Sequence, residues 1–294
     1  MDRAALTQLL AKLRPSLHRY SARMTGSVID GEDVVQSALA RAIEAFATEP
    51  PVDNPAGWLF RITHNAALDF LRRRARERGL LSGEEAPAMT DDGPSAEARV
   101  AMAASLRTFL RLPVAQRSSV LLMDVLGHSL EEIAAITGAT VPAVKAALHR
   151  GRSRLRELAG EPEGARSPAL TPAERASLQA YVDHFNAHDF DSVRELLAEE
   201  VRAEVVDRAR MKGKKEVSTY FHNYSGKSDW LLAPGLVEGR PAALVLDPAD
   251  PEGPARYFVL LEWAGGRLLT LRDFRYARYV VDGAEMVPLG ATGP

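Results

Sequence analysis

Five arginines fall within seven residues near the end of one predicted helix, at residues 72–78. Guanidinium groups clustered in this way bind phosphate oxygens, and an asparagine such as Asn65 can pair with the edge of an adenine. Arginines at a helix C-terminus also complement the helix dipole. An exposed charge gains less than about 1 kcal/mol there, which does not require five of them. The pattern therefore favours a nucleic-acid surface over a merely solvated helix end.

The helix that carries these arginines is predicted to begin at Pro55, which suits a first turn, and to end at Gly79. The side away from its core is predicted to carry Arg61, His64 and Asn65. Apolar residues within about one third of the helical circle predict its buried face: Trp58, Leu59, Ile62, Ala66 and Phe70.

A helix-turn-helix is predicted over residues 129–156. Ser129 and Glu132 have the spacing of a capping box, and residues 138–140 supply a short turn. A second helix follows, with Thr140 as its cap and Pro142 in its first turn. Its apolar stripe consists of Val144, Leu148, Gly151 and Leu155. Its cationic side consists of Lys145, His149, Arg150, Arg152 and Arg156. Such a helix suits insertion into a major groove; the alternative is a solvated cationic helix packed on its neighbour.

The elements that must position these side chains divide the chain into parts. Before residue 160 the apolar residues recur three and four apart, which is typical of helices. After residue 200 short apolar runs separated by turn signals predict strands. Two Gly- and Pro-containing breaks interrupt the pattern, an acidic segment at 79–98 and a second at 160–172. We expect an all-α front and an α+β back.

Charge is distributed unevenly along the 294 residues. Taken for the whole chain, the net charge of −2 argues against nucleic acid as a partner. That total, however, averages segments of opposite charge. Residues 1–160 hold 21 Lys and Arg against 18 Asp and Glu, whereas residues 161–294 hold 16 against 21. Five of the acidic residues of the front half lie in the segment 79–98. The helical parts of the front half, outside that segment, are therefore strongly basic. Cysteine is absent, and no stretch approaches the roughly 18 apolar residues of a membrane span, so we expect a cytoplasmic protein.

Three motifs in order resemble the group IV, or extracytoplasmic-function, RNA polymerase sigma factors. DGEDVVQSALARAIEAF, at 30–46, is similar to the helix that docks on the polymerase clamp. NPAGWLFRITHNAALDFLRRRAR, at 54–76, is similar to the segment that contacts and melts the −10 promoter element, and the loop 48–55 lies where the family holds a flipped base. Residues 112–158 resemble the domain that reads the −35 element, and the acidic segment lies at the family's linker.

The resemblance implies three sets of contacts. Polymerase binding is assigned to Asp33, Val34, Val35 and Gln36. Contacts with the −10 element are assigned to Arg61, Asn65, Arg72, Arg73, Arg74 and Arg76. Contacts with the −35 element are assigned to Lys145, His149, Arg150 and Arg152. Ser37 stands where an acidic residue is usual, and Ala146 and Ala147 replace the more usual Ser-Arg, so the −35 sequence is expected to be atypical or weakly read.

Residues after 170 exceed what a simple member of that family carries. A helix from Pro172, a short helix at 189–200, a strand at 200–206, a helix at 213–224 and four strands resemble the SnoaL-like branch of the NTF2-like fold. That fold is a curved antiparallel sheet wrapped round helices, with a pocket. Its pocket is assigned to His184, Asp207, Tyr220, Trp230, Phe274 and Tyr276.

The expected architecture is two all-α sigma domains, the second a helix-turn-helix, followed by an α+β NTF2-like cone. The boundaries are 1–78 for region 2, 79–98 for the acidic linker, 99–160 for region 4, 161–170 for a second linker and 171–294 for the regulatory domain. The expected partners are core RNA polymerase, double- and single-stranded promoter DNA, and, within the chain, the C-terminal domain against the sigma domains; no membrane, metal, cofactor or catalytic residue is expected. The alternatives are a helix-turn-helix regulator that does not dock on polymerase, and a DNA-localised enzyme or small-molecule sensor that uses the cone pocket.

Overall fold

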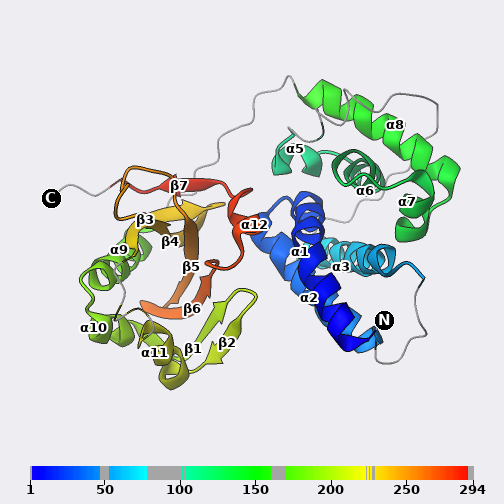
Figure 1. Cartoon of the computed structure of the whole chain (residues 1–294). Helices are drawn as coiled ribbons and strands as arrows, with labels where there is room; N and C mark the ends of the chain where they lie inside the picture. Colours follow the sequence, from blue (N-terminus) through cyan, green and yellow to red (C-terminus); the bar gives the residue numbers. More distant parts are fainter. Residues whose placement is uncertain are drawn as a thin grey trace. The chain divides into compact units, whose positions relative to one another are not determined.

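The computed structural model describes residues 2–46, 53–77, 101, 104–159, 170–222, 224, 226 and 229–290. The predicted acidic linker 79–98, nearly all of the predicted linker 161–170 and most of the loop 48–55 lie outside these ranges. The chain forms two compact units, residues 1–163 and residues 164–294 (Figure 1). In the described part of the chain, no helix is both long and apolar enough to cross a membrane.

The N-terminal unit is helical throughout its described part. Its first three helices are α1 (Arg3–Thr25), α2 (Val28–Phe46) and α3 (Pro55–Glu77). The following elements are α5 (Leu106–Leu110), α6 (Val114–Val120), the π-helical segment η1 (Leu121–Val125), α7 (Leu130–Thr137) and α8 (Val141–Leu158). The front half is therefore all-α, as predicted.

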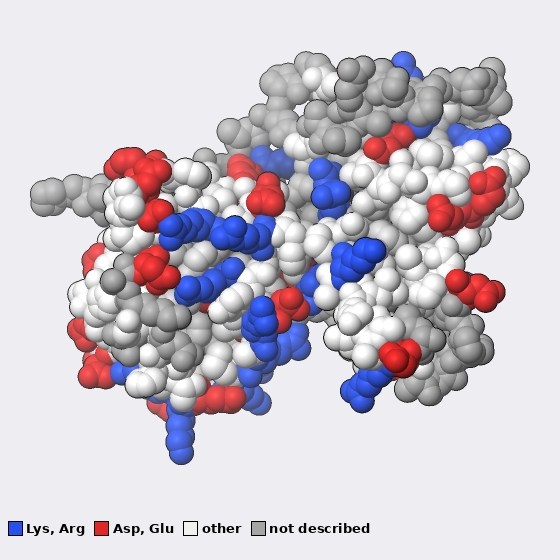
Figure 2. Space-filling view, viewed as in Figure 1, with Lys and Arg blue, Asp and Glu red and all other residues white. Residues whose placement is uncertain are grey.

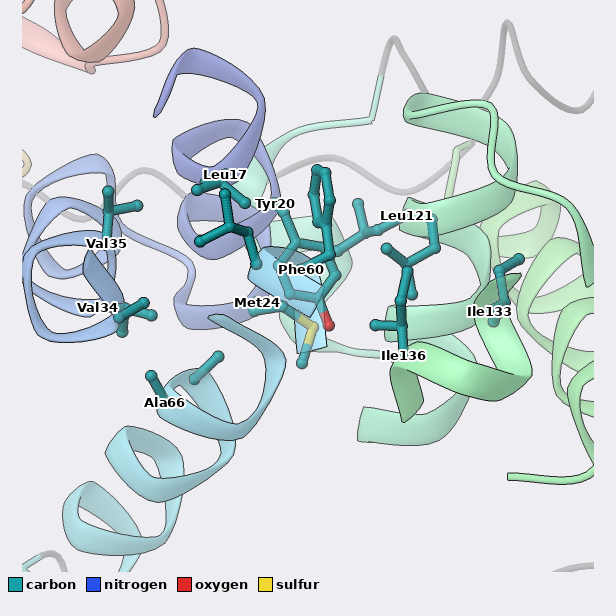
Figure 3. Close-up of a cluster of buried hydrophobic side chains, with 14 of the residues drawn as sticks. Leu17, Tyr20, Met24, Val34, Val35, Phe60, Ala66, Leu121, Ile133 and Ile136 are labelled. Atoms are coloured by element: carbon teal, nitrogen blue, oxygen red, sulfur yellow. The ribbon is translucent and has the colours of Figure 1, made fainter. Parts of the chain in front are cut away.

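One hydrophobic core joins all of these helices. Figure 3 shows side chains from α1, α2 and α3 beside others from η1 and α7. Tyr20 of α1 and Phe60 of α3 meet edge to face with ring centroids 6.4 Å apart. Leu121 of η1 and Ile133 of α7 belong to the same cluster. The sequence predicts two helical modules joined by a linker, and the structure adds that the two modules pack on one another.

The C-terminal unit is a mixed sheet with helices packed on it (Figure 1). Two helices precede the sheet, α9 (Pro172–Asn186) and α10 (Phe190–Glu195). The strands are β1 (Leu197–Val205), β2 (Ala209–Lys212), β3 (Leu231–Val237), β4 (Arg240–Leu246), β5 (Tyr257–Ala264), β6 (Arg267–Asp273) and β7 (Met286–Pro288). Helix α11 (Lys214–His222) separates β2 from β3, and α12 (Arg278–Val281) follows β6.

The strand order is β2-β1-β6-β5-β4-β3-β7, and every neighbouring pair is antiparallel except β1 and β6. Helix α9 packs on β3, β4 and β5, and α11 packs on β1 and β2. The α+β class is confirmed, and the sheet is antiparallel as expected except for the one parallel pair of β1 and β6. The parallel pair arises because β1 reaches β6 through a long connection that includes the hairpins between them.

Candidate nucleic-acid interface

Helix α3 presents one polar side while its other side is packed in the core. The amide of Gly57 donates to Asn54 Oδ1 at 2.9 Å and so caps the start of the helix. Leu59 and Ala66 are buried, as the apolar pattern predicts. Arg61 and Asn65 are exposed on the outer side, and Arg72, Arg73 and Arg76 are exposed further along. This row of four arginines and one amide offers hydrogen-bond donors to phosphates and base edges.

Ion pairs engage part of the arginine cluster. The Arg74 guanidinium donates to Asp30 of α2 at 2.5 Å, and that carboxylate is buried. Arg74 therefore ties the end of α3 to α2, and its assignment as a DNA contact stays a prediction. Asp69 accepts from Arg41 at 2.9 Å and from Arg72 at 3.4 Å on the surface. These exposed pairs are weak, so Arg72 can exchange its carboxylate for a phosphate.

His64 does not face outward as its position on the predicted helix suggests. It is buried, and the Tyr20 hydroxyl lies 2.6 Å from its Nδ1. Burial lowers the pKa of His64 to about 4, helped by the nearby charge of Arg72. Burial also raises the pKa of Tyr20 far above its usual value, so the hydroxyl keeps its proton and donates to a neutral imidazole. His64 is a structural residue beneath the polar face.

Helix α8 has the form predicted for a recognition helix. The capping box is present at the start of α7, where the amide of Glu132 donates to Ser129 Oγ at 3.2 Å and Glu132 Oε2 accepts from the Ser129 amide at 2.8 Å. Gly138 ends α7 with a φ of 74°, a backbone conformation that favours glycine. The amide of Ala143 donates to Thr140 Oγ1 at 3.3 Å and caps α8. The buried stripe of α8 is the predicted one: Val144, Leu148, Gly151 and Leu155.

The cationic side of α8 is smaller than predicted. Lys145 is exposed, and His149 and Arg150 are half-buried. Arg152 instead makes a two-pronged ion pair with Asp124 of η1, from Nε at 3.0 Å and from a terminal nitrogen at 2.7 Å. The side-chain exposures are 14% for Arg152 and 2% for Asp124. The guanidinium of Arg152 thus fixes α8 against η1, and its assignment to DNA stays a prediction.

The predicted polymerase-binding residues of α2 divide into two pairs. Asp33 is exposed and Gln36 is half-buried. Val34 and Val35 are 2% and 0% exposed and belong to the hydrophobic core (Figure 3). In this packing they hold the helix that presents the polar pair, and their assignment as polymerase contacts stays a prediction.

Contacts between the two modules are specific as well as apolar. Phe60 of α3 meets His128, just before α7, edge to face at 4.7 Å between centroids. Arg117 of α6 is buried and donates to the carbonyl of Met24 at 2.5 Å, in the last turn of α1. It also donates to the carbonyls of Leu110 and Leu112 at 3.2 and 2.9 Å. The second helical module is thereby attached to both α1 and α3 of the first.

The predicted pocket residues of the C-terminal unit do not converge. Tyr220 and Trp230 line a small cavity between the helices and the sheet. His184 lies at the surface of α9 beside Asp189, and Asp207 is exposed in the β1–β2 turn with a φ of 66°. Phe274 is buried against Phe258 with centroids 4.5 Å apart, and Tyr276 is exposed. None of these four side chains lines this cavity, so their assignment to a pocket stays a prediction.

Most of the residues that line the cavity were not among the predicted pocket residues. The lining residues are Tyr181, Phe185, Tyr220, Tyr224, Trp230, Leu232, Val245, Tyr257 and Val259. Asp273, at the end of β6, accepts hydrogen bonds from the hydroxyls of Tyr220 and Tyr224 at 2.8 and 2.9 Å. Burial raises the pKa of Asp273, and these bonds and the Arg275 amide oppose the rise. The cavity volume is about 10 Å³, room for about one water, and the described residues hold no group of three metal-ligating side chains.

Comparisons with known proteins agree with the motif order. Residues 9–77 match the family model of sigma-70 region 2, and residues 106–155 match that of sigma-70 region 4. The chain is 32% identical to the ECF RNA polymerase sigma factor SigE of Mycolicibacterium smegmatis over 163 residues, which cover 53% of this chain and 63% of that protein. A crystal structure of the sigma factor SigJ of Mycobacterium tuberculosis resembles the chain at 23% identity with a TM-score of 0.36, covering 91% of this chain and 95% of that one.

The similarity to one relative extends into the C-terminal unit. The ECF RNA polymerase sigma factor SigG of Mycobacterium tuberculosis is 30% identical over 282 residues, which cover 84% of this chain and 75% of that protein. The chain carries both sigma regions on the two helical modules described above. It therefore belongs to the extracytoplasmic-function (ECF) RNA polymerase sigma factors.

Proposed function

We propose that this chain is a dissociable specificity subunit of RNA polymerase that directs the core enzyme to particular promoters and opens the −10 element. One observation carries the proposal: two separate helices, α3 and α8, each expose polar and cationic side chains while their apolar sides share a core. Arg61 and Asn65 on α3 would contact the −10 strand, and Lys145 and His149 on α8 would contact the −35 duplex. Arg150 would support the second contact from the edge of α8.

Docking on core polymerase is assigned to the exposed side of α2, at Asp33 and Gln36. A carboxylate on a helix surface can pair with a cationic partner without disturbing the core behind it. Replacement Asp33→Ala should weaken co-purification with core polymerase several-fold, while Asp191→Ala, which removes an exposed carboxylate from α10, should leave it unchanged. Equal retention of the two variants would contradict docking through α2.

The packed arrangement of the two modules must open for this function. The −10 and −35 elements lie well apart on a promoter, whereas α3 and α7 are in direct contact through Phe60 and His128. Core polymerase, by binding the separated modules more tightly than the packed ones, would supply the free energy for opening. The chain alone would then bind promoter DNA weakly.

Regulation of the sigma modules by residues 171–294 is the second part of the proposal. The C-terminal part of the chain is net acidic and the N-terminal part net basic, and a covalent tether raises the effective concentration of one against the other. Removal of residues 161–294 should change transcription from a cognate promoter, in either direction. Identical transcript yields with and without those residues, at matched protein concentrations, would contradict this part alone.

A further inference from the structure

The outer face of the first strands of the C-terminal sheet is basic, although the unit as a whole is acidic. Side chains two residues apart on a strand point to the same face. On β1 this face carries Arg202 and Glu204, while Val201 and Ala203 point inward and are buried. On β2 and β6 it carries Arg210, Lys212 and Arg272, of which Arg272 is only 13% exposed. Glu262 of β5 shares this face, because Arg202 and Glu262 both pair with Thr270. Figure 2 shows basic side chains, with acidic ones among them, around the β1–β2 hairpin.

Ion pairing accounts for only part of this charge. Glu204 accepts from Arg210 Nε at 3.1 Å and from Arg272 Nε at 3.0 Å, so one carboxylate serves two guanidinium groups. Among the residues the structure describes, no carboxylate forms an ion pair with the side chain of Arg202, Arg208 or Lys212. The Glu216 carboxylate accepts from the backbone amide of Lys212 instead, at 2.9 Å. Exposed cations left unpaired on one face create a positive potential that attracts polyanions.

One cross-strand pair works against folding. Arg202 lies directly opposite Lys212 in the antiparallel register of β1 and β2. Like charges at opposite positions destabilise a strand pair, where an opposite-charge pair would stabilise it. A local rule broken in this way, with no compensating contact in the fold, is typical of a functional surface. A bound anion between the two side chains would remove the repulsion.

An exposed aromatic ring lies at the end of the same strands. Tyr276 follows β6 and is 52% exposed, and the side chain of Arg210 on β2 is 72% exposed. The guanidinium carbon of Arg208, in the β1–β2 turn, lies 4.8 Å from the centre of the Tyr276 ring. An accessible ring beside arginines is how single-stranded nucleic acids are bound without sequence preference, because every base can stack on it.

We propose that this basic sheet face, made of Arg202, Arg210 and Lys212 with Arg208 and Tyr276 at its end, binds single-stranded nucleic acid. Its phosphates would lie against Arg202, Lys212 and Arg210, and one unstacked base would lie on Tyr276. Single strands are favoured over duplex because a base inside a duplex cannot reach the ring. Promoter opening would supply the single-stranded DNA, so the biological role of this face rests on the proposed function. Binding of a single strand by this face does not depend on that function.

The decisive variant is Arg202→Glu in the full-length chain. It replaces a like-charge pair with an opposite-charge pair across β1 and β2, so thermal stability should stay equal or rise. Binding of fluorescent oligothymidine, which carries no promoter sequence, should weaken several-fold. The slope of log affinity against log salt should become shallower by about 0.7 for each phosphate that the variant no longer neutralises. A purely structural role for Arg202 predicts a change in stability and none in binding.

A second pair of variants tests the ring. Tyr276→Ala should weaken binding at least about fivefold, the loss expected from one stacked base, and Tyr276→Phe should retain it. Arg175→Glu, an equal charge change at the start of α9, is the matched control and should bind like the parent. Oligouridine in parallel distinguishes RNA from DNA as the preferred strand.

Unchanged affinity in both Arg202→Glu and Tyr276→Ala would overturn the proposal. So would an equal loss in Arg175→Glu, because the effect would then reflect net charge alone. If the two variants kept oligonucleotide binding and lost affinity for core polymerase, the face would be a protein-docking surface and the proposal would be wrong. None of these measurements depends on transcription, so failure of the proposed function would be visible separately.

Discussion

Buried histidines in the N-terminal unit are held neutral by their surroundings. His18 Nε2 donates to the carbonyl of Val28 at 2.8 Å, and His64 accepts from Tyr20. Burial lowers the pKa of both imidazoles to about 4. Because each folded-state pKa lies below the unfolded value, the stabilisation is present above about pH 6.5 and is lost as pH falls towards 4.

The histidines therefore predict acid sensitivity of this unit. Each shift corresponds to roughly 3 kcal/mol across that interval. Replacement His64→Gln keeps an acceptor for Tyr20 and removes the titration, so the unfolding midpoint should fall less steeply between pH 6.5 and 4 than in the parent. His149→Gln, which changes a half-buried side chain on α8, is the control. Parallel pH profiles for parent and His64→Gln would contradict the assignment. Thermal unfolding followed by circular dichroism measures both.

Replacing Arg152 should mainly lower stability, whereas replacing Lys145 should mainly weaken DNA binding. Both residues belong to the same predicted cationic side of α8. Replacement Arg152→Ala leaves the buried Asp124 carboxylate unpaired and should lower the free energy of unfolding by about 3 kcal/mol. Lys145→Ala should change it by less than about 0.5 kcal/mol and should weaken binding of −35 DNA in the holoenzyme. Urea unfolding measures the free energy of unfolding, and fluorescence anisotropy measures the affinity for −35 DNA. Comparable destabilisation by both replacements would contradict the distinction.

Residue types predicted the helical faces well and the ion pairs poorly. The stripe of Val144, Leu148 and Leu155 follows from periodicity along one helix. The Arg152–Asp124 and Arg74–Asp30 pairs join residues 28 and 44 positions apart, and no pattern along one helix shows such a pair. The same limit hid the hydrogen bonds that join Asp273 to tyrosines on and just after α11.

Among the helices and strands, capping and periodicity correctly located the helix-turn-helix. In the C-terminal unit, by contrast, pairing between strands replaced part of a helix that local propensity predicts. The helix predicted at 189–200 ends at Glu195, because residues from Leu197 pair with β6. Leucine and glutamate favour helices when isolated, so the local signal was misleading there. Strand β6 ends at Asp273, whose carboxylate accepts from the amide of Arg275 at 2.8 Å, and α12 begins at Arg278.

The packing of the two helical modules on one another cannot be predicted from any single sequence motif. Since the chain has no cysteine, Glu44→Cys on α2 and Glu157→Cys on α8 allow a dye to be placed in each module. Both side chains are exposed. Energy transfer between the dyes should be high in the free chain and should fall when core polymerase is added. Unchanged transfer on forming the holoenzyme would contradict the opening of the modules.

The whole molecule joins a basic, all-α unit to an acidic, α+β unit. The net charge of −2 conceals this division, which explains why whole-chain charge is a poor guide to nucleic-acid binding here. The family is that of transcription initiation factors, and the polar faces of α3 and α8 agree with that role. In the described part of the second unit, the aromatic cavity lined by Tyr220 and Trp230 holds about 10 Å³, which is too small as it stands for a small-molecule ligand.

Promoter-directed run-off transcription with core polymerase tests the central claim most directly. The full-length chain should support transcripts from a cognate promoter. The double replacement Arg61→Ala with Asn65→Ala should reduce them at least about tenfold on duplex DNA while leaving co-purification with polymerase intact. The loss should be smaller on a template already unpaired at −10, because opening would no longer be required. Full transcript yield from the double variant on duplex DNA would contradict the assignment of α3 to promoter recognition and opening.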